Sequence, residues 1–162
     1  MNPARRFYPL FLDISGKRAV VVGGGRVAYR KTVALIEAGA RVTVIAPRFD
    51  ERFSAAPVER IAREYRAGDL AGARLAFAAT DRRNVNARVA REARSLGIPV
   101  NVADAPAQGD FIVPARARRA NIQIAISTSA SNPALAAKIR ARIEALLDDI
   151  LKAELPHSPA DN

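Results

Sequence analysis

The first hundred residues alternate between short apolar runs and longer amphipathic segments. Runs of Val, Ile and small apolar residues, of the kind that forms buried parallel strands, stand at 17–22, 41–45, 58–64, 74–79 and 99–102. The third run could equally be an edge segment. Between the runs, apolar residues recur three and four positions apart in two helical segments and in one shorter segment, at 26–38, 84–96 and 49–56. This alternation predicts an α/β fold with a doubly wound, mostly parallel sheet.

The pattern changes after Asp104. Asp110–Pro114 and Asn121–Ser127 are expected to form two strands, separated by a basic stretch at 115–120, and they could pair antiparallel. Asn132 then caps a helix that has Pro133 at its first position and runs to about Leu151. A hairpin and one helix are too small to bury a core of their own. Homodimerisation through 113–150 is therefore expected.

The predicted organisation has three parts. Residues 1–112 form the sheet domain, 113–151 form a β-hairpin and helix for dimerisation and for a substrate cleft, and 152–162 form a disordered tail. No stretch approaches the roughly 18 apolar residues of a membrane span, and residues 1–12 lack the apolar core of a secretory signal. A cytoplasmic protein with no membrane partner is expected.

The charge of the chain is strongly positive. Lys and Arg number 26 against 16 Asp and Glu, which gives a net charge of +10, and nearly all of the excess is arginine. Nucleic acid is disfavoured as a partner, because the arginines are scattered and no recognition motif appears. Two explanations stay open: a compositional bias that keeps the protein soluble, or a small ligand with several carboxylates, which guanidinium groups bind bidentately.

Several kinds of chemistry are excluded by residue types that are absent or rare. The chain has no cysteine, and its one histidine, His157, lies in the polar C-terminal segment. A thiolate nucleophile, a disulfide framework and a Cys or His metal site are therefore not expected. No metal site is predicted.

A glycine-rich turn joins the first predicted strand to the first predicted helix. Gly23-Gly24-Gly25-Arg26-Val27-Ala28 matches the G-x-G-x-x-G/A pattern of Rossmann-type dinucleotide-binding domains. In that pattern the first glycine permits the tight turn, the second lets the backbone approach a pyrophosphate, and the small sixth residue allows close helix packing. The alternative is a glycine-rich turn that binds nothing. Candidate cofactor-binding residues here are Gly23, Gly24, Gly25, Arg26 and Val27.

The ends of the second and fourth predicted strands hold further candidates. An acidic residue normally follows the second strand, but here Pro47 and Arg48 follow it, and an arginine could stack on adenine or bind a 2′-phosphate. NAD is the expected cofactor, and NADP is not excluded. Thr80 and Asp81 are the candidate cofactor-binding residues after the fourth strand, and Thr80 is expected to contact the ribose or the nicotinamide. Its alternative role is to cap the following helix together with Asp81.

These segments resemble the precorrin-2 dehydrogenase family, which includes the N-terminal domain of sirohaem synthases. The resemblance runs from about Tyr8 to Leu147. It is carried by an ordered series of motifs: Tyr8–Leu12, Val21–Ala28, Ala78–Asp81, Asn101–Asp104, Phe111–Pro114, Ile124–Ser129 and Asn132–Ala136. The resemblance implies a Rossmann NAD-binding domain followed by a hairpin and helix that dimerise. It also implies oxidation of precorrin-2 to sirohydrochlorin with NAD as hydride acceptor, and some family members also insert ferrous iron.

A polycarboxylated tetrapyrrole would give the arginine excess a chemical purpose. Arg116, Arg118 and Arg119 are the candidate carboxylate ligands, against the alternative of a solvated basic turn. The resemblance also implies substrate contacts for Asn101, Ser127 and Thr128. The two hydroxyl residues could instead form a local turn before the helix.

Asp104 matches the family's important aspartate and is the candidate catalytic residue. Dehydrogenation of a saturated ring carbon needs a proton acceptor, and few other bases are available without Cys or a well-placed His. Asp104 could accept the proton or orient the macrocycle; otherwise it is a turn residue before Ala105-Pro106. Asp110 is a second candidate.

Three other functions stay open. The chain could also be a ferrochelatase, with Asp104 serving twice. It could be a non-catalytic NAD-sensing module, or it could carry a tetrapyrrole without changing it. Replacement of Asp104 by alanine separates an enzyme from a sensor, since only the enzyme should lose function.

Overall fold

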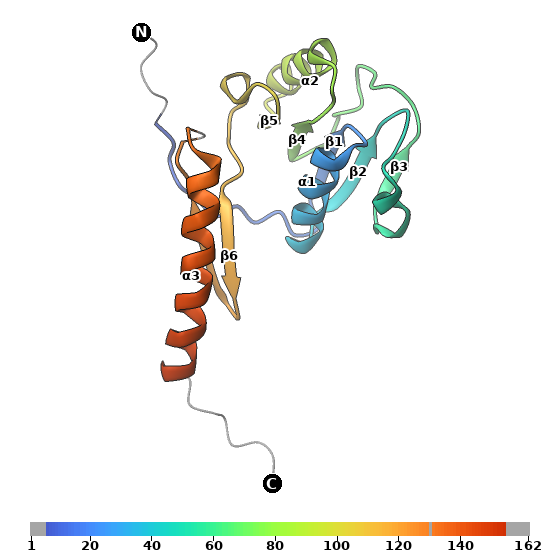
Figure 1. The fold of residues 1–162 in the computed structure, drawn as a ribbon. Helices are drawn as coiled ribbons and strands as arrows, with labels where there is room; N and C mark the ends of the chain where they lie inside the picture. The colour runs from blue at the N-terminus through green and yellow to red at the C-terminus, as the bar shows by residue number, and fades with distance from the viewer. Residues whose placement is uncertain (1–5, 130, 155–162) are drawn as a thin grey trace. The chain divides into compact units, whose positions relative to one another are not determined.

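The computed structural model describes residues 6–129 and 131–154, drawn in Figure 1. They form two compact units, one of residues 8–112 and one of residues 113–154 with residues 6 and 7. The C-terminal residues 155–162, which include His157 and most of the predicted tail, lie outside the described part of the chain.

The larger unit is built on a five-stranded parallel sheet with strand order β3-β2-β1-β4-β5. The strands are β1 (Arg18–Val22), β2 (Arg41–Ile45), β3 (Glu59–Ile61), β4 (Leu75–Ala78) and β5 (Val100–Val102). Two helices follow strands, α1 (Arg26–Glu37) after β1 and α2 (Arg83–Ser95) after β4. The strand order reverses between β1 and β4, which is the switch point of a doubly wound fold. The predicted Rossmann-type fold class is confirmed.

Each face of this sheet is covered by one of the helices (Figure 1). Val20 and Val22 of β1 belong to the core cluster that includes Val89 of α2. Val21 belongs to the other cluster, with Leu35 of α1. Successive side chains of a strand point to opposite faces, so the unbroken Val run of β1 reflects burial on both sides.

Two short 3₁₀ helices lie in the connections. The first, η1 (Glu51–Ala55), stands where a short helix was expected and is capped by Asp50, whose Oδ1 accepts a hydrogen bond of 3.2 Å from the Arg52 backbone N–H. The second, η2 (Pro106–Gln108), follows β5. β3 is only three residues long and lies at the sheet edge, which agrees with the edge segment considered from the sequence.

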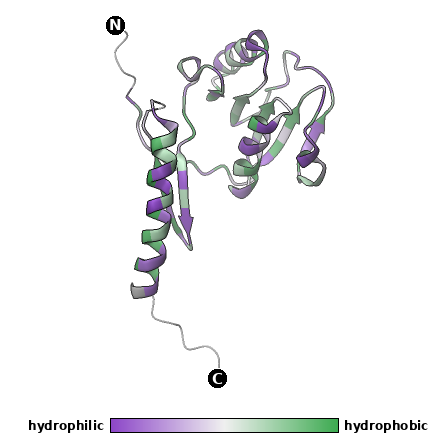
Figure 2. Ribbon diagram, viewed as in Figure 1, coloured by the Kyte–Doolittle hydropathy of each residue, from purple (hydrophilic) through white to green (hydrophobic). Residues whose placement is uncertain are grey.

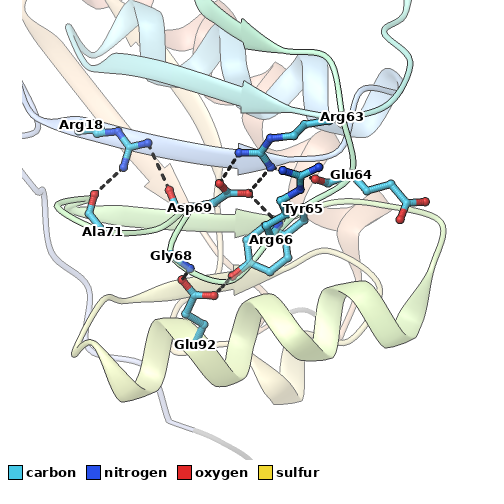
Figure 3. A network of polar contacts seen from close by, with 9 residues as sticks. All are labelled: Arg18, Arg63, Glu64, Tyr65, Arg66, Gly68, Asp69, Ala71 and Glu92. Carbon is cyan, nitrogen blue, oxygen red and sulfur yellow. Dashed lines mark hydrogen bonds and ion pairs between the residues drawn. The ribbon is translucent and has the colours of Figure 1, made fainter.

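The connection between β3 and β4 is held by a polar network, shown in Figure 3. Arg63 makes a bidentate ion pair with Asp69, with bonds of 2.8 and 2.6 Å. Arg18 of β1 donates to the carbonyl oxygen of Ala71 at 2.7 Å. The Tyr65 hydroxyl bonds to Glu92 of α2, and burial, together with this carboxylate, raises the pKa of Tyr65. The network fixes the connection at the amino ends of β1 and β4.

The smaller unit is an antiparallel hairpin, β6 (Ala115–Arg119) and β7 (Ile122–Ile126), with helix α3 (Pro133–Glu154). The strand predicted at 110–114 was wrong, because the basic stretch itself is the strand. Its residues alternate with period two, and Ala117, only 1% exposed, lies on the inward side. Pro114 has no N–H to contribute to a ladder.

Asn132 begins α3 as predicted: its Oδ1 accepts a hydrogen bond of 2.9 Å from the Leu135 N–H, and Pro133 is the first helical residue. The helix continues to Glu154, past the predicted end at Leu151. Polar and apolar segments alternate along it in Figure 2. Within 6–129 and 131–154, no helix is long and apolar enough to cross a membrane.

Candidate functional site

Three loops meet along the carboxyl edge of the parallel sheet. They follow β1, β4 and β5, which are neighbours in the sheet, and they carry the glycine loop 23–25, Thr80 and Asp104 respectively. Ligands of open α/β sheets bind outside the carboxyl ends of the strands, where the strand order reverses. The structure therefore brings these sequence candidates to one edge.

The three glycines of the loop face different surroundings. A Cβ on Gly23 would lie 2.4 Å from the Ala79 carbonyl oxygen, and the φ of Gly23 is 131°. A Cβ on Gly24 would lie 2.0 Å from the Arg48 carbonyl oxygen. A Cβ on Gly25 would meet nothing within 4 Å. The loops after β4 and β2 therefore approach the first two glycines so closely that a side chain would not fit. The third glycine borders open space.

The N-terminus of α1 beside Gly25 has the properties of an anion site. Gly25 is the N-cap, so no side chain of the N-cap residue bonds to the first N–H groups of the helix. The first turn has no acidic residue. The first helical N–H groups have no partner within a helix and carry partial positive charge. Arg26 is exposed and Val27 is 40% exposed at this turn. The open space at Gly25 and these free donors fit the pyrophosphate of a dinucleotide.

The loop after β2 contributes a carboxylate that sequence reasoning missed. Pro47 and Arg48 are exposed at the end of β2, as expected. The Asp50 N–H donates to the Gly24 carbonyl oxygen at 2.8 Å, which ties this loop to the glycine loop. Hydrogen bonds from Arg52, at 2.7 Å to each oxygen, lower the pKa of Asp50 to about 2, so the carboxylate is ionised at neutral pH. The acidic residue that normally follows this strand is absent from 46–48, and Asp50 comes later in the loop.

Thr80 is held by Asn86 and by its own loop. The Thr80 N–H and hydroxyl both donate to Asn86 Oδ1, at 3.1 and 2.8 Å. The hydroxyl also accepts from the Arg82 N–H at 3.1 Å. The N-cap of α2 is Arg82 and no side chain caps the helix, so the alternative of a cap formed by Thr80 and Asp81 is wrong. Asp81 is exposed.

Asp104 is bonded to the same asparagine. Asn86 Nδ2 donates to Asp104 Oδ1 at 2.8 Å, and Arg83 Nε lies 4.0 Å from Asp104 Oδ2. The Asp104 side chain is 30% exposed, whereas Asn86 is 1% exposed. Sequence reasoning missed Asn86, although its position three before the inward Val89 on an amphipathic helix marked it as a buried amide.

The other two candidates near β5 make structural contacts. Asn101 is 5% exposed and its Nδ2 donates to the Phe111 carbonyl oxygen at 3.0 Å. Asp110 pairs with Val100 twice: its N–H donates to the Val100 oxygen at 2.8 Å, and its carboxylate accepts from the Val100 N–H at 2.9 Å. These bonds attach the segment after η2 to the edge of β5. Substrate contact by Asn101 stays a prediction.

The candidates of the smaller unit lie on β6 and in the turn before α3. Arg119 forms an ion pair with Asp148 of α3, Nε to Oδ1 at 2.6 Å. Arg116 and Arg118 are exposed, and all three arginines lie on β6 rather than in a turn. Oγ of Ser127 accepts from the Ser129 N–H at 3.0 Å. Oγ1 of Thr128 accepts from the Asn132 N–H at 3.1 Å, so both hydroxyls support the turn before α3.

A surface hollow of about 550 Å³ lies away from the carboxyl edge. It is lined by residues of the β3–β4 connection and of the C-terminal half of α2. None of the sequence-predicted site residues lines it. Among the described residues, no three His, Cys, Asp or Glu side chains gather in a way that could hold a metal ion.

Lys31 of α1 is a largely buried cation near this sheet. Its Nζ lies 5.6 Å from the centre of the Phe77 ring, and burial, with a smaller effect of Arg30, lowers its pKa from 10.5 to about 8. A pKa that is lower in the folded protein means that the charged form costs stability below about pH 8. That cost decreases as the pH rises from 8 towards 10.5.

We expect the substitution Lys31→Met to increase the free energy of unfolding by about 2 kcal/mol near neutral pH, after allowance for partial exposure. The gain should shrink as the pH rises from 8 and disappear above 10.5, where the lysine is largely neutral in both states. Urea unfolding of both proteins at the two pH values measures this. Lys17→Met, at an exposed position, is the control. A Lys31→Met protein less stable than the parent at neutral pH would contradict the burial cost.

Residues 10–115 match a family model described as "Putative NAD(P)-binding". The chain belongs to this NAD(P)-binding family. The match covers the whole parallel sheet and the carboxyl-edge loops described above. The glycine loop and the N-terminus of α1 are thus part of an NAD(P)-binding domain, and the sequence-based assignment of a nicotinamide cofactor is confirmed at that level.

Relatives of this NAD(P)-binding chain include siroheme synthases. The siroheme synthase of Pseudomonas putida (strain W619) is 43% identical over 142 residues, which are 85% of this chain and 31% of the relative. That of Ectopseudomonas mendocina (strain ymp) is 45% identical over 141 residues, 86% of this chain and 30% of the relative. The chain therefore spans about a third of the length of these curated relatives.

A solved structure supports the fold of this NAD(P)-binding chain. SirC, precorrin-2 dehydrogenase, superposes with a TM-score of 0.70 at 24% sequence identity, over 95% of this chain and 84% of that one. The two proteins share their fold. The shared fold and the similarity to siroheme synthases over 85% of this chain agree with the family resemblance stated from the sequence.

Proposed function

We propose that this chain is an NAD-dependent precorrin-2 dehydrogenase that forms sirohydrochlorin in sirohaem biosynthesis. One juxtaposition carries the proposal: a dinucleotide loop, Thr80 and a partly exposed carboxylate, Asp104, follow three neighbouring strands. The similarity to siroheme synthases over 85% of this chain supports it, as does the fold shared with a precorrin-2 dehydrogenase.

In this proposal each group of residues has one task. The N–H groups of the first turn of α1 bind the pyrophosphate beside Gly25, and Thr80 contacts the ribose or the nicotinamide. The nicotinamide, when bound, accepts a hydride from the substrate. The Asp104 carboxylate accepts the proton that leaves as the ring system is oxidised. Arg116 and Arg118 bind substrate carboxylates from the exposed side of β6.

We propose NAD rather than NADP as the cofactor. The Asp50 backbone N–H bonds to the glycine loop, and its ionised carboxylate would disfavour a 2′-phosphate nearby. The Arg52 guanidinium is engaged in a bidentate pair with Asp50, so it is not available to bind a 2′-phosphate. Arg48 is then free to stack on the adenine.

We further propose that residues 113–151 form a homodimer interface and part of the substrate cleft. Large apolar side chains of α3 that remain exposed are spaced four, seven and four positions apart, so they form one stripe along the helix: Leu135, Ile139, Leu146 and Ile150. Leu147 is buried on a different side of the helix. An apolar stripe of this kind is typical of a surface that a second copy covers.

The substitution Leu146→Glu is expected to weaken the dimer by at least about tenfold, because it would bury a charge in an apolar contact. Sedimentation equilibrium measures the dissociation constant. Lys138→Glu, an exposed position outside the stripe, is the matched control. A chain that is monomeric at all concentrations tested would refute the proposed interface.

The proposed activity is tested by anaerobic incubation of the purified chain with enzymatically generated precorrin-2. Parallel samples contain NAD, NADP or no dinucleotide, and the absorption spectrum is followed before and after ferrous ion is added. Sirohydrochlorin formation that depends on NAD is the expected result. A further change with ferrous ion, faster than the uncatalysed rate, would add ferrochelatase activity. No reaction with either dinucleotide would reject the proposal.

A further inference from the structure

Asn86 is the buried residue that connects the two polar candidates at the carboxyl edge. It lies in the first turn of α2 and is 1% exposed. Its Oδ1 accepts from the Thr80 N–H and hydroxyl at 3.1 and 2.8 Å. Its Nδ2 donates to the Thr80 carbonyl oxygen at 3.0 Å and to Asp104 Oδ1 at 2.8 Å. All donors and acceptors of the amide are therefore used.

The partners determine which way this amide points. The Thr80 carbonyl oxygen accepts hydrogen bonds only, and so does an ionised Asp104 carboxylate, so the NH₂ group must face both of them. The Thr80 N–H donates only, so the amide oxygen must face it. A flipped amide would place its oxygen against two acceptor oxygens and its NH₂ group against the Thr80 N–H, which would leave buried polar groups unpaired. Asn86 is thus locked in a single orientation.

This orientation has a consequence for Asp104. One carboxylate oxygen, Oδ1, is held by a buried donor that cannot rotate. Oδ2 is 4.0 Å from Arg83 Nε, and the Arg83 side chain is 92% exposed. A carboxylate anchored at one oxygen keeps its rotamer and presents the other oxygen to a ligand. Without Asn86, the Asp104 side chain could rotate freely.

We propose that Asn86 is a positioning residue that fixes the Asp104 carboxylate relative to Thr80. The inference rests on the proposed function, in which Asp104 accepts the substrate proton and Thr80 contacts the dinucleotide. Proton transfer needs the acceptor within hydrogen-bond reach of the leaving proton, and small misplacements of reacting groups cost large factors in rate. Asn86 therefore sets the distance between the proton acceptor and the cofactor side of the site.

The first test is a double-mutant cycle with Asn86→Ala and Asp104→Ala. Asn86→Ala alone should lower kcat, measured at saturating NAD, by about ten- to a hundredfold. In the Asp104→Ala background, Asn86→Ala should cause no further loss, because it acts through Asp104. Asn84→Ala, an exposed position on the same turn, should leave kcat unchanged. Equal losses from Asn86→Ala in both backgrounds would overturn the proposal.

A second measurement does not depend on enzyme activity and leaves Asn86 itself unsubstituted. The side-chain NH₂ of Asn86 gives a pair of resonances in a ¹⁵N–¹H spectrum, and the proton bonded to Asp104 should shift in the Asp104→Ala protein. Asp81→Ala, which removes a nearby exposed carboxylate, should leave this pair in place. An unchanged pair in Asp104→Ala would overturn the proposal. If the parent chain does not oxidise precorrin-2, the proposed function fails, whereas this spectrum still reports on the Asn86–Asp104 bond.

Discussion

Replacing Asp104 by alanine is expected to lower the turnover of precorrin-2 by about a hundred- to ten-thousandfold, the usual range for loss of a general base. Affinity for NAD should change little, since Asp104 follows β5 and the dinucleotide loop follows β1. The carboxylate is 30% exposed and, within the described residues, accepts one hydrogen bond, from Asn86 Nδ2 to Oδ1. Its loss therefore removes a proton acceptor and leaves one buried N–H unpaired.

Steady-state rates with saturating NAD, together with calorimetric titration of NAD, separate the two effects. Asp104→Asn tests proton acceptance more specifically, because asparagine keeps the shape of the side chain but cannot act as a base. Asp13→Asn, in an exposed loop, is the control. Unchanged turnover in Asp104→Ala would show that the carboxylate is not the proton acceptor, and a fully retained biological function without turnover would favour the NAD-sensing module.

Gly25→Ala is expected to weaken NAD binding by about ten- to a hundredfold, the value of one or two hydrogen bonds to a charged group. The added methyl group would meet no protein atom within 4 Å, and the φ of Gly25 is an ordinary −89°. Its cost to the fold should be at most about 1 kcal/mol, the cost of alanine at an N-cap. The methyl group would instead occupy space that the pyrophosphate needs.

Gly24→Ala provides the contrast, because its methyl group would lie 2.0 Å from the Arg48 carbonyl oxygen. This variant should lose stability as well as NAD binding. Thermal unfolding and NAD titration of both variants distinguish the two glycines. If Gly25→Ala binds NAD as tightly as the parent chain, the dinucleotide does not approach the backbone at this loop.

The order of the strands and helices could be predicted because the local signals were strong. The Val run of β1 is buried on both faces, and Gly39 and Gly97 stand just after α1 and α2, so the hydrophobic period and the helix-ending residues agreed. The carboxyl edge followed from a general rule for parallel sheets, which brought Thr80 and Asp104 to one side. These inferences needed no knowledge of side-chain contacts.

The residues that sequence reasoning missed are those with distant partners. Asn86 bonds to Asp104, and Asp50 bonds through its backbone to Gly24, and neither pairing leaves a local pattern. The hairpin was misplaced for a related reason. Arg116 and Arg118 alternate with small residues, which is a strand pattern, but their charge suggested a turn. Burial of Ala117 decides in favour of the strand.

The proposed hydride transfer from precorrin-2 to NAD can be tested by its stoichiometry. Oxygen must be excluded, because a reduced macrocycle can also be oxidised without an enzyme. The quantities of NADH and sirohydrochlorin formed in the same anaerobic sample are then compared. The proposed function predicts equal amounts that rise together with enzyme concentration. Sirohydrochlorin without matching NADH, or neither product, would contradict it.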